Sequence, residues 1–157
     1  MPITLPDEEY YRTLPRKAIG AGMLLFNTQG ELLIVKPDYR EDWLLPGGSS
    51  EVDESPLQCA IRETEEEIGL TISAPTLVGV SHRPARGMRP ESVLFIFHGG
   101  TLTDSDIARI HLQESEIEDM RFLPMEEALS LLSENLLTVI PYCMSALKGG
   151  GIVCVDV

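Results

Sequence analysis

Short apolar runs separated by polar turns recur along the chain and predict β-strands. The runs cover residues 18–26, 31–36, 43–45, 77–82, 92–98 and 120–123. The first two flank the segment Asn27 to Gly30, and Asn and Gly are typical of the tight turn of a β-hairpin. Trp43 opens the third run, where a lone tryptophan before an apolar pair more often packs in the core than stacks on a base.

Helix-forming segments alternate with these runs. Helices are predicted over residues 56–68, 125–133 and 136–147, and a loop with a short helical turn over 102–112. Pro124 precedes the second helix, whose first turn holds Glu126 and Glu127, as the helix dipole favours. Pro141 is expected to interrupt or restart the third helix. Strands that alternate with helices predict a mixed α/β protein.

The two ends of the chain differ from its middle. Residues 1–15 are polar and proline-spaced, which predicts a loosely packed arm. Residues 149–157 contain three glycines followed by an apolar, β-prone tail, which we expect to add to a sheet edge in this chain or in a second subunit. At 157 residues we interpret residues 1–157 as a single domain, with a homodimer left open.

The predicted helix 56–68 concentrates carboxylates on one stripe. A helix advances about 100° per residue, so positions three and four apart share a face. Glu63, Glu66 and Glu67 therefore converge, with Arg62 beside them. Carboxylates this close repel each other unless a cation lies among them, and hard oxygen ligands suit Mg²⁺ or Mn²⁺. This stripe is a candidate metal site.

The sequence around this helix agrees with that interpretation. Ser55 and Pro56 are typical of a helix start, and Gly69 is typical of a helix end. Leu45 to Gly48 predict a turn whose glycines let the backbone approach a ligand closely. The opposite stripe is mostly apolar and is expected to pack on a core; it comprises Leu57, Ala60, Ile61, Thr64 and Ile68.

The alternative is that these glutamates form a solvated helix face. An exposed charged face usually interleaves Lys or Arg with its acids. Between residues 51 and 70, however, Arg62 is the only cation against seven acidic residues. A calcium EF-hand is excluded, because its loop pattern occurs nowhere in the chain. The excess of acids favours a bound cation.

The same residues resemble a known family motif. Gly48, five residues, Glu54, seven residues and then Arg62 to Leu70 resemble the Nudix box, G-x5-E-x7-R-E-U-x-E-E-x-G-U, of the Nudix hydrolases, where U is a bulky apolar residue. Every fixed position matches over these 23 residues, and the one departure is Thr64, where an aliphatic residue is usual. Thr64 is expected to weaken packing slightly without touching the metal.

The resemblance implies a Nudix-type α/β/α sandwich and specific residue roles. Glu63, Glu66 and Glu67 would be metal ligands, perhaps joined by the Gly47 carbonyl. Glu63 would also be the general base, although some Nudix enzymes carry that base outside the box. Arg62 would orient the glutamates, and Glu54 would support the loop or the metal ligands.

A further metal ligand is expected outside the box. In the family a glutamate from another loop often completes the metal site, and Glu116 matches best by its distance from the aromatic residue of the following strand. Glu114 and Glu118 lie two residues to either side and are alternatives. A solvated acidic loop is the other interpretation of this segment.

Overall charge restricts the partners. The formal net charge is −13, from 12 basic and 25 acidic side chains, which argues against nucleic-acid binding. Three of the few basic residues, Arg83, Arg86 and Arg89, nevertheless cluster in one predicted loop. They are either a solvated hairpin tip or a substrate loop whose guanidinium groups bind phosphate.

The cysteines and the hydropathy indicate the compartment. Cys59, Cys143 and Cys154 are odd in number and form no C-x-x-C pair, which is typical of free thiols in a reducing compartment. The N-terminus has no signal-peptide pattern, and no run approaches the roughly 18 apolar residues of a membrane span. We expect a cytoplasmic protein that does not contact membranes.

The function that the resemblance implies is Mg²⁺-dependent hydrolysis of the pyrophosphate linkage in a nucleoside diphosphate linked to another moiety. Nucleoside triphosphates, ADP-ribose, nucleotide sugars and dinucleoside polyphosphates all fit this class. A non-catalytic nucleotide sensor that regulates a partner is the alternative, although such sensors commonly lose glutamates that are present here. An isoprenoid diphosphate isomerase would require a catalytic cysteine and metal-binding histidines in motifs that the chain lacks.

Overall fold

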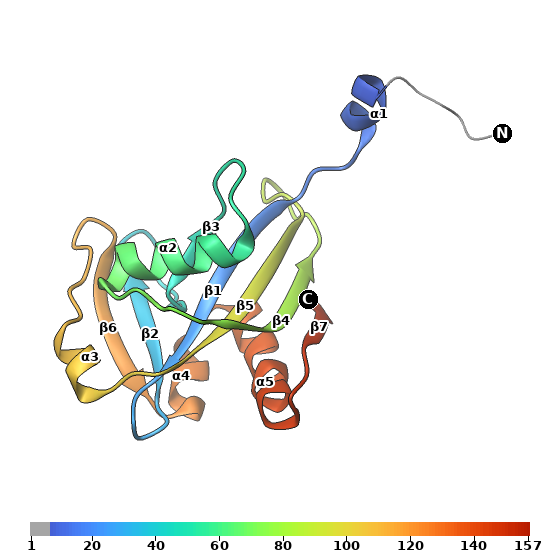
Figure 1. Ribbon diagram of the computed structural model, residues 1–157. Coiled ribbons are helices and arrows are strands. Elements are labelled where there is room, and N and C mark those ends of the chain that lie inside the picture. Colours follow the sequence, from blue (N-terminus) through green and yellow to red (C-terminus); the bar gives the residue numbers. More distant parts are fainter. Residues whose placement is uncertain (1–6) are drawn as a thin grey trace.

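A mixed β-sheet forms the centre of the molecule (Figure 1), and the computed structural model describes residues 7–157. The strands are β1 (Ala18–Phe26), β2 (Leu32–Pro37), β3 (Gly47–Ser49), β4 (Thr76–Arg83), β5 (Ser92–Thr101), β6 (Ile117–Leu123) and β7 (Val153–Asp156). The helices are α1 (Asp7–Thr13), α2 (Pro56–Ile68), α3 (Asp104–Ala108), α4 (Met125–Leu131) and α5 (Glu134–Gly149). None of these helices is both long and apolar enough to cross a membrane.

The strand order is β6-β2-β1-β5-β4-β7, and β3 pairs with β1 beside this path. The β1–β5 and β4–β7 pairs are parallel, and the other pairs are antiparallel. The predicted hairpin is present, since β1 and β2 pair directly after the turn at Asn27 to Gly30. The strand bounds predicted for residues 18–26 match β1, and β2 begins one residue later than predicted.

Two hydrophobic cores cover the two faces of the sheet. Side chains alternate along each strand, so Met23 and Leu25 face α2 while Leu24 and Phe26 face α4 and α5. Trp43 lies in the core on the α4–α5 side, as predicted, and the Arg121 guanidinium lies over its ring at 4.7 Å. The result is an α/β/α sandwich, which confirms the predicted fold class.

Helix α2 begins and ends where the sequence predicts. The Ser55 hydroxyl accepts the Gln58 N–H, and the Gln58 side chain accepts the Ser55 N–H, which completes a capping box. Gly69 ends the helix in the left-handed conformation. The predicted apolar stripe is wrong at Leu57, which is 41% exposed and lies outside the core that buries Cys59 and Ala60.

Three local predictions needed correction because strand pairing decided the structure. The predicted glycine turn is a short strand, β3, since its backbone pairs with Gly20 to Gly22 of β1. Residues 43–45 make only isolated bridges and form no strand of their own. The last predicted strand begins at Ile117, three residues before the apolar run, because pairing with β2 extends through the acidic residues.

Helix α5 is continuous through Pro141, contrary to the predicted interruption. Proline removes one backbone hydrogen bond, which would destabilise an isolated helix. Here the opposite side of the helix packs on the sheet through Val139, Ile140 and Cys143, which are fully buried, whereas Pro141 is exposed. Tertiary burial therefore outweighs the local preference.

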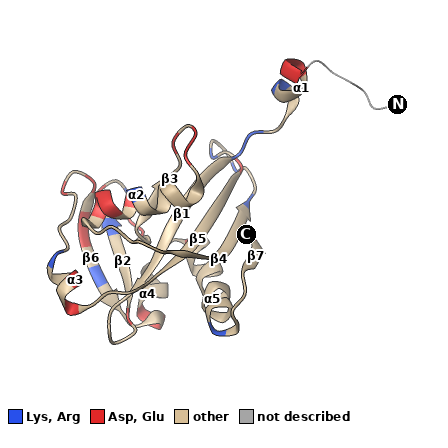
Figure 2. Ribbon diagram, in the orientation of Figure 1, with Lys and Arg blue, Asp and Glu red and all other residues tan. Residues whose placement is uncertain are grey.

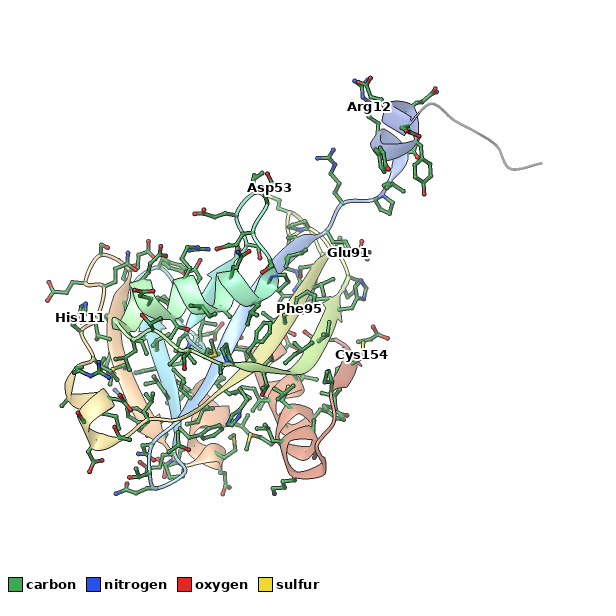
Figure 3. All side chains as sticks on the ribbon, viewed as in Figure 1. Arg12, Asp53, Glu91, Phe95, His111 and Cys154 are labelled. Carbon is green, nitrogen blue, oxygen red and sulfur yellow. The ribbon has the colours of Figure 1, made fainter. Side chains whose placement is uncertain are left out.

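The two ends of the chain also differ from each other in the structure. Of the predicted arm over residues 1–15, residues 1–6 lie outside the described part, and residues 7–13 form α1, which has no buried residue. Figure 3 shows Arg12 on this helix, away from the sheet. The tail forms β7, which pairs in parallel with β4 of its own chain.

Candidate active site

Arg62 lies at the centre of a group of carboxylates on α2 and the loop before it. Its Nε and Nη2 donate to the two carboxylate oxygens of Glu54 at 2.7 and 3.0 Å. Its Nη1 donates to Glu63 and to Glu66, at 2.9 Å each. One guanidinium thus donates hydrogen bonds to three carboxylates, and the orienting role that the family resemblance implies for Arg62 stays a prediction.

Glu67 is the most deeply buried of these carboxylates, at 6% exposed. The Gly47 N–H donates to its Oε2 at 2.9 Å. The pKa of Glu67 is raised to about 8, chiefly by burial and also by the charges of Glu63, Glu116 and Glu66, against the opposing effect of the Gly47 hydrogen bond. A carboxylate in this position requires either a proton or a nearby cation to be stable.

Glu63 lies against the glycine strand. A Cβ on Gly48 would lie 2.5 Å from the Glu63 carboxyl group, so only glycine allows this contact. Gly47 has φ of 149°, and a Cβ there would lie 2.1 Å from the Ala21 carbonyl oxygen. Burial raises the pKa of Glu63, while the Arg62 hydrogen bond lowers it. The two glycines therefore bring main chain and carboxylates into direct contact.

Glu54 and Glu116 approach the cluster from separate loops. The hydrogen bonds from Arg62 and from the Glu51 N–H lower the pKa of Glu54 to about 2, so it stays ionised. Glu116 is exposed in the loop before β6, and its charge acts on both Glu63 and Glu67. Glu118, one of its two alternatives, lies 3.9 Å from Lys36 instead.

The acidic end of α2 lies beside the acidic segment that leads into β6 (Figure 2). Among residues 7–157, no three His, Cys, Asp or Glu side chains already form a metal-binding group, and Arg62 donates hydrogen bonds to Glu63 and Glu66. The donors are nonetheless all hard oxygens, and Glu67 is buried among further negative charge. This chemistry fits Mg²⁺ or Mn²⁺ better than softer metals.

The predicted arginines occupy two environments. Arg83 ends β4 and is half-buried, whereas Arg86 and Arg89 pair through their backbones across the tight β4–β5 turn. A cavity of about 140 Å³ connects Gly47 and Gly48 with Arg83. The structure therefore brings Arg83 next to the glycine strand, and leaves Arg86 exposed at the tip of the turn.

Sequence reasoning missed several residues of this region. Burial and the charge of Glu67 raise the pKa of Tyr39, which lies near the carboxylates. Arg40, Ser133 and Asn135 line the cavity beside Gly47. Arg40 and Tyr39 belong to a polar loop, and Asn135 to a predicted helix start, so none carried a motif. A larger cavity, about 420 Å³, lies elsewhere, beyond the C-terminal end of α2.

The NUDIX domain family profile matches residues 16–143, which span both the box and the sheet. The chain belongs to the Nudix hydrolase family. It is 31% identical over 124 residues to the ADP-ribose pyrophosphatase of Methanocaldococcus jannaschii, covering 75% of this chain and 71% of that protein. It is 31% identical to the RNA pyrophosphohydrolase of Hahella chejuensis over 88 residues, which cover 56% of this chain and about half, 51%, of that relative.

The solved structures agree on the fold of this Nudix chain. The NUDIX domain of Shewanella oneidensis NrtR, complexed with ADP-ribose, superposes with a TM-score of 0.70. The alignment covers 91% of this chain and 99% of that domain at 18% sequence identity. At this identity the likeness establishes the shared fold alone.

Proposed function

We propose that this Nudix chain is a Mg²⁺-dependent hydrolase, with Mn²⁺ as a substitute, that cleaves the pyrophosphate linkage of a nucleoside diphosphate linked to another moiety. The observation that carries the proposal is the carboxylate cluster, in which buried Glu67 faces the charges of Glu63, Glu66 and Glu116. Such a cluster is stable when a divalent cation neutralises it. All of the glutamates of the Nudix box are present, which favours an enzyme over a non-catalytic sensor.

We assign the metal to Glu63, Glu66 and Glu67, with the Gly47 carbonyl and Glu116 as further ligands. When bound, the ion neutralises charge on the pyrophosphate oxygens during hydrolysis. Arg62 fixes Glu63 and Glu66 relative to each other, and Glu54 fixes Arg62 through two parallel hydrogen bonds.

Glu63 is the residue that we assign as general base for the attacking water. Burial raises its pKa, which makes it a better proton acceptor than an exposed glutamate. The contact with Gly48 holds its carboxyl group at the glycine strand, where main chain lets a substrate approach closely. The base and the backbone that positions the pyrophosphate are therefore adjacent.

The substrate class follows from the site and from the relatives. The related protein of Methanocaldococcus jannaschii is named an ADP-ribose pyrophosphatase, and the structurally similar NrtR domain is complexed with ADP-ribose. Both names support a small nucleotide with a pyrophosphate linkage as the substrate of this chain. The net charge of −13 disfavours a nucleic-acid substrate, since phosphate backbones require a basic surface.

The test is turnover across a panel of nucleoside triphosphates, ADP-ribose, nucleotide sugars and dinucleoside polyphosphates, with and without Mg²⁺ or Mn²⁺. We expect metal-dependent release of phosphate or phosphorylated products from one group of compounds. Glu67→Gln should lower turnover by orders of magnitude, whereas the exposed Glu65→Gln on the same helix should not. Nucleotide binding without any turnover would instead establish the sensor.

A further inference from the structure

Three arginines of this acidic chain lie together without a carboxylate partner. Most of the arginines in residues 7–157 are ion-paired with Asp or Glu, namely Arg12, Arg40, Arg62, Arg109 and Arg121. Apart from Arg16 in the N-terminal arm, the arginines with no such pair are Arg83, Arg86 and Arg89. These three line one cavity of about 130 Å³. Arg89 repels Arg83, and Glu134 on the same lining offsets this repulsion only in part, so an anion in the cavity would be stabilised.

Arg83 is the member of this group whose environment is least favourable. Its side chain is half-buried, and its buried Nε makes no hydrogen bond within residues 7–157. Burial lowers the pKa of Arg83, and the charges of Arg89 and Arg40 lower it further. Burying a guanidinium N–H without a hydrogen-bond acceptor raises the free energy of the folded protein. A ligand that accepts a hydrogen bond from Arg83 would remove this desolvation cost.

The amino-terminal end of α5 completes the same cavity. Asn135 lines it, is only 9% exposed, and has an Oδ1 without a hydrogen-bond partner in the described residues. The Ser133 side chain makes no cap hydrogen bond, and this 16-residue helix directs its positive end towards the cavity. Rotation of the Asn135 amide by about 180° would present its NH₂ group to an anion. Glu134, the one acidic side chain on the lining, is exposed.

The cavity adjoins the proposed active site. Arg83 and Asn135 also line the cavity that reaches Gly47 and Gly48, with Arg40 on the same wall. Gly47, whose N–H donates to Glu67, lines this second cavity, so Arg83 and the backbone contact of Glu67 border the same cavity. A substrate whose pyrophosphate lies at the glycine strand would place another of its groups at Arg83.

We propose that Arg83 and Arg89, with the amino-terminal end of α5, bind a phosphate group that the substrate carries outside the linkage that is cleaved. The inference rests on the proposed function and narrows its substrate class to nucleoside diphosphate derivatives with at least one additional phosphate. A tetrahedral phosphate accepts hydrogen bonds from several directions, which suits two guanidinium groups and a helix terminus. Arg86, at the exposed tip of the turn, adds positive charge near the phosphate group but does not enclose it.

The test compares two pairs of substrates whose members differ by one phosphate. The first pair is ADP-ribose and ADP-ribose 2′-phosphate, and the second is dephospho-coenzyme A and coenzyme A. We expect wild-type kcat/KM to favour the phosphorylated member by about 10- to 100-fold, the range of charge-assisted hydrogen bonds. Arg83→Gln should reduce this ratio to about one. The matched control is Arg16→Gln, which removes the same charge from an unpaired arginine outside the cavity and should leave the ratio unchanged.

A second measurement separates this inference from the proposed hydrolase. Inorganic phosphate titrated into the metal-free protein in EDTA should bind to the wild type and much more weakly to Arg83→Gln. If phosphate binds through Arg83 but no compound is hydrolysed, the hydrolase proposal fails while the anion site is supported. If metal-dependent hydrolysis occurs and both members of each pair react equally, the hydrolase stands and the substrate-phosphate inference is overturned. An equal loss for both members in Arg83→Gln would also overturn it.

Discussion

Replacing Glu67 with Gln should stabilise the metal-free protein at neutral pH, although it removes a proposed metal ligand. Burial and three neighbouring carboxylates raise the pKa of Glu67 from 4.5 to about 8 in the folded state. When the pKa of a group is higher in the folded than in the unfolded state, its contribution to stability is fully present below the pKa of the unfolded state. That contribution is lost as the pH rises through the pKa of the folded state. The loss therefore falls between about pH 4.5 and pH 8.

The size of the effect follows from the same shift. The free energy of unfolding should fall by about 1.4 kcal/mol for each pH unit within this window. At pH 7 the accumulated loss is about 3 kcal/mol. Gln cannot ionise, but its side-chain oxygen can still accept the Gly47 N–H. Glu67→Gln should therefore be more stable than wild type by about 3 kcal/mol at pH 7, and by little near pH 4.5.

Urea denaturation in EDTA at pH 5, 6, 7 and 8 measures this difference. Glu65→Gln is the control, since it makes the same charge change at an exposed position of α2. Added Mg²⁺ should reverse the order at pH 7, because wild type gains about 4.1 kcal/mol at a free concentration about 1,000 times Kd and the variant gains much less. If the free energies of unfolding of wild type and Glu67→Gln changed in parallel with pH, the argument that burial raises the pKa of Glu67 would be refuted.

Three further predictions concern the surroundings of this carboxylate. Arg62→Lys should lower kcat/KM about 10- to 100-fold in steady-state assays, because lysine keeps the charge but cannot hold a carboxylate by two parallel hydrogen bonds; an unchanged value would contradict the orienting role. Gly48→Ala should displace the adjacent carboxylate and reduce turnover at least about tenfold, whereas Gly149→Ala, which meets open space, should leave turnover intact and raise stability by about 0.5–1 kcal/mol in thermal unfolding. Glu116→Gln should raise the Mg²⁺ concentration for half-maximal turnover and Glu114→Gln should not; the opposite result would reassign the outer ligand.

Local signals made helix α2 and its carboxylates predictable from the sequence. Ser55 and Gly69 determine the ends of this helix, because each makes hydrogen bonds to a residue only three or four positions away in the sequence. The spacing of Glu63, Glu66 and Glu67 determines that they share a helix face, since that geometry depends on helix periodicity alone. The bounds of β1 were equally predictable, because a nine-residue apolar run followed by a turn has few alternatives.

Predictions failed where contacts between distant segments outweighed local preference. The glycine segment forms β3 because β1 offers it a pairing partner, and α5 continues through Pro141 because its other side packs on the sheet. Leu57 belongs to an apolar stripe by spacing, yet it is exposed in the structure. Periodicity states which residues share a face, but not how far the opposing surface reaches.

The sequence by itself determined the family, the fold class and the helix stripe on which the candidate carboxylates lie. Only the tertiary structure decided that Glu67 is buried while Glu66 on the same stripe is exposed, and that Arg83 and Asn135 line one cavity. Burial and electrostatic environment depend on which surfaces the folded sheet brings together. Residues far apart in the chain acquire perturbed pKa values and unpaired polar atoms only through that assembly, and no short-range pattern encodes it.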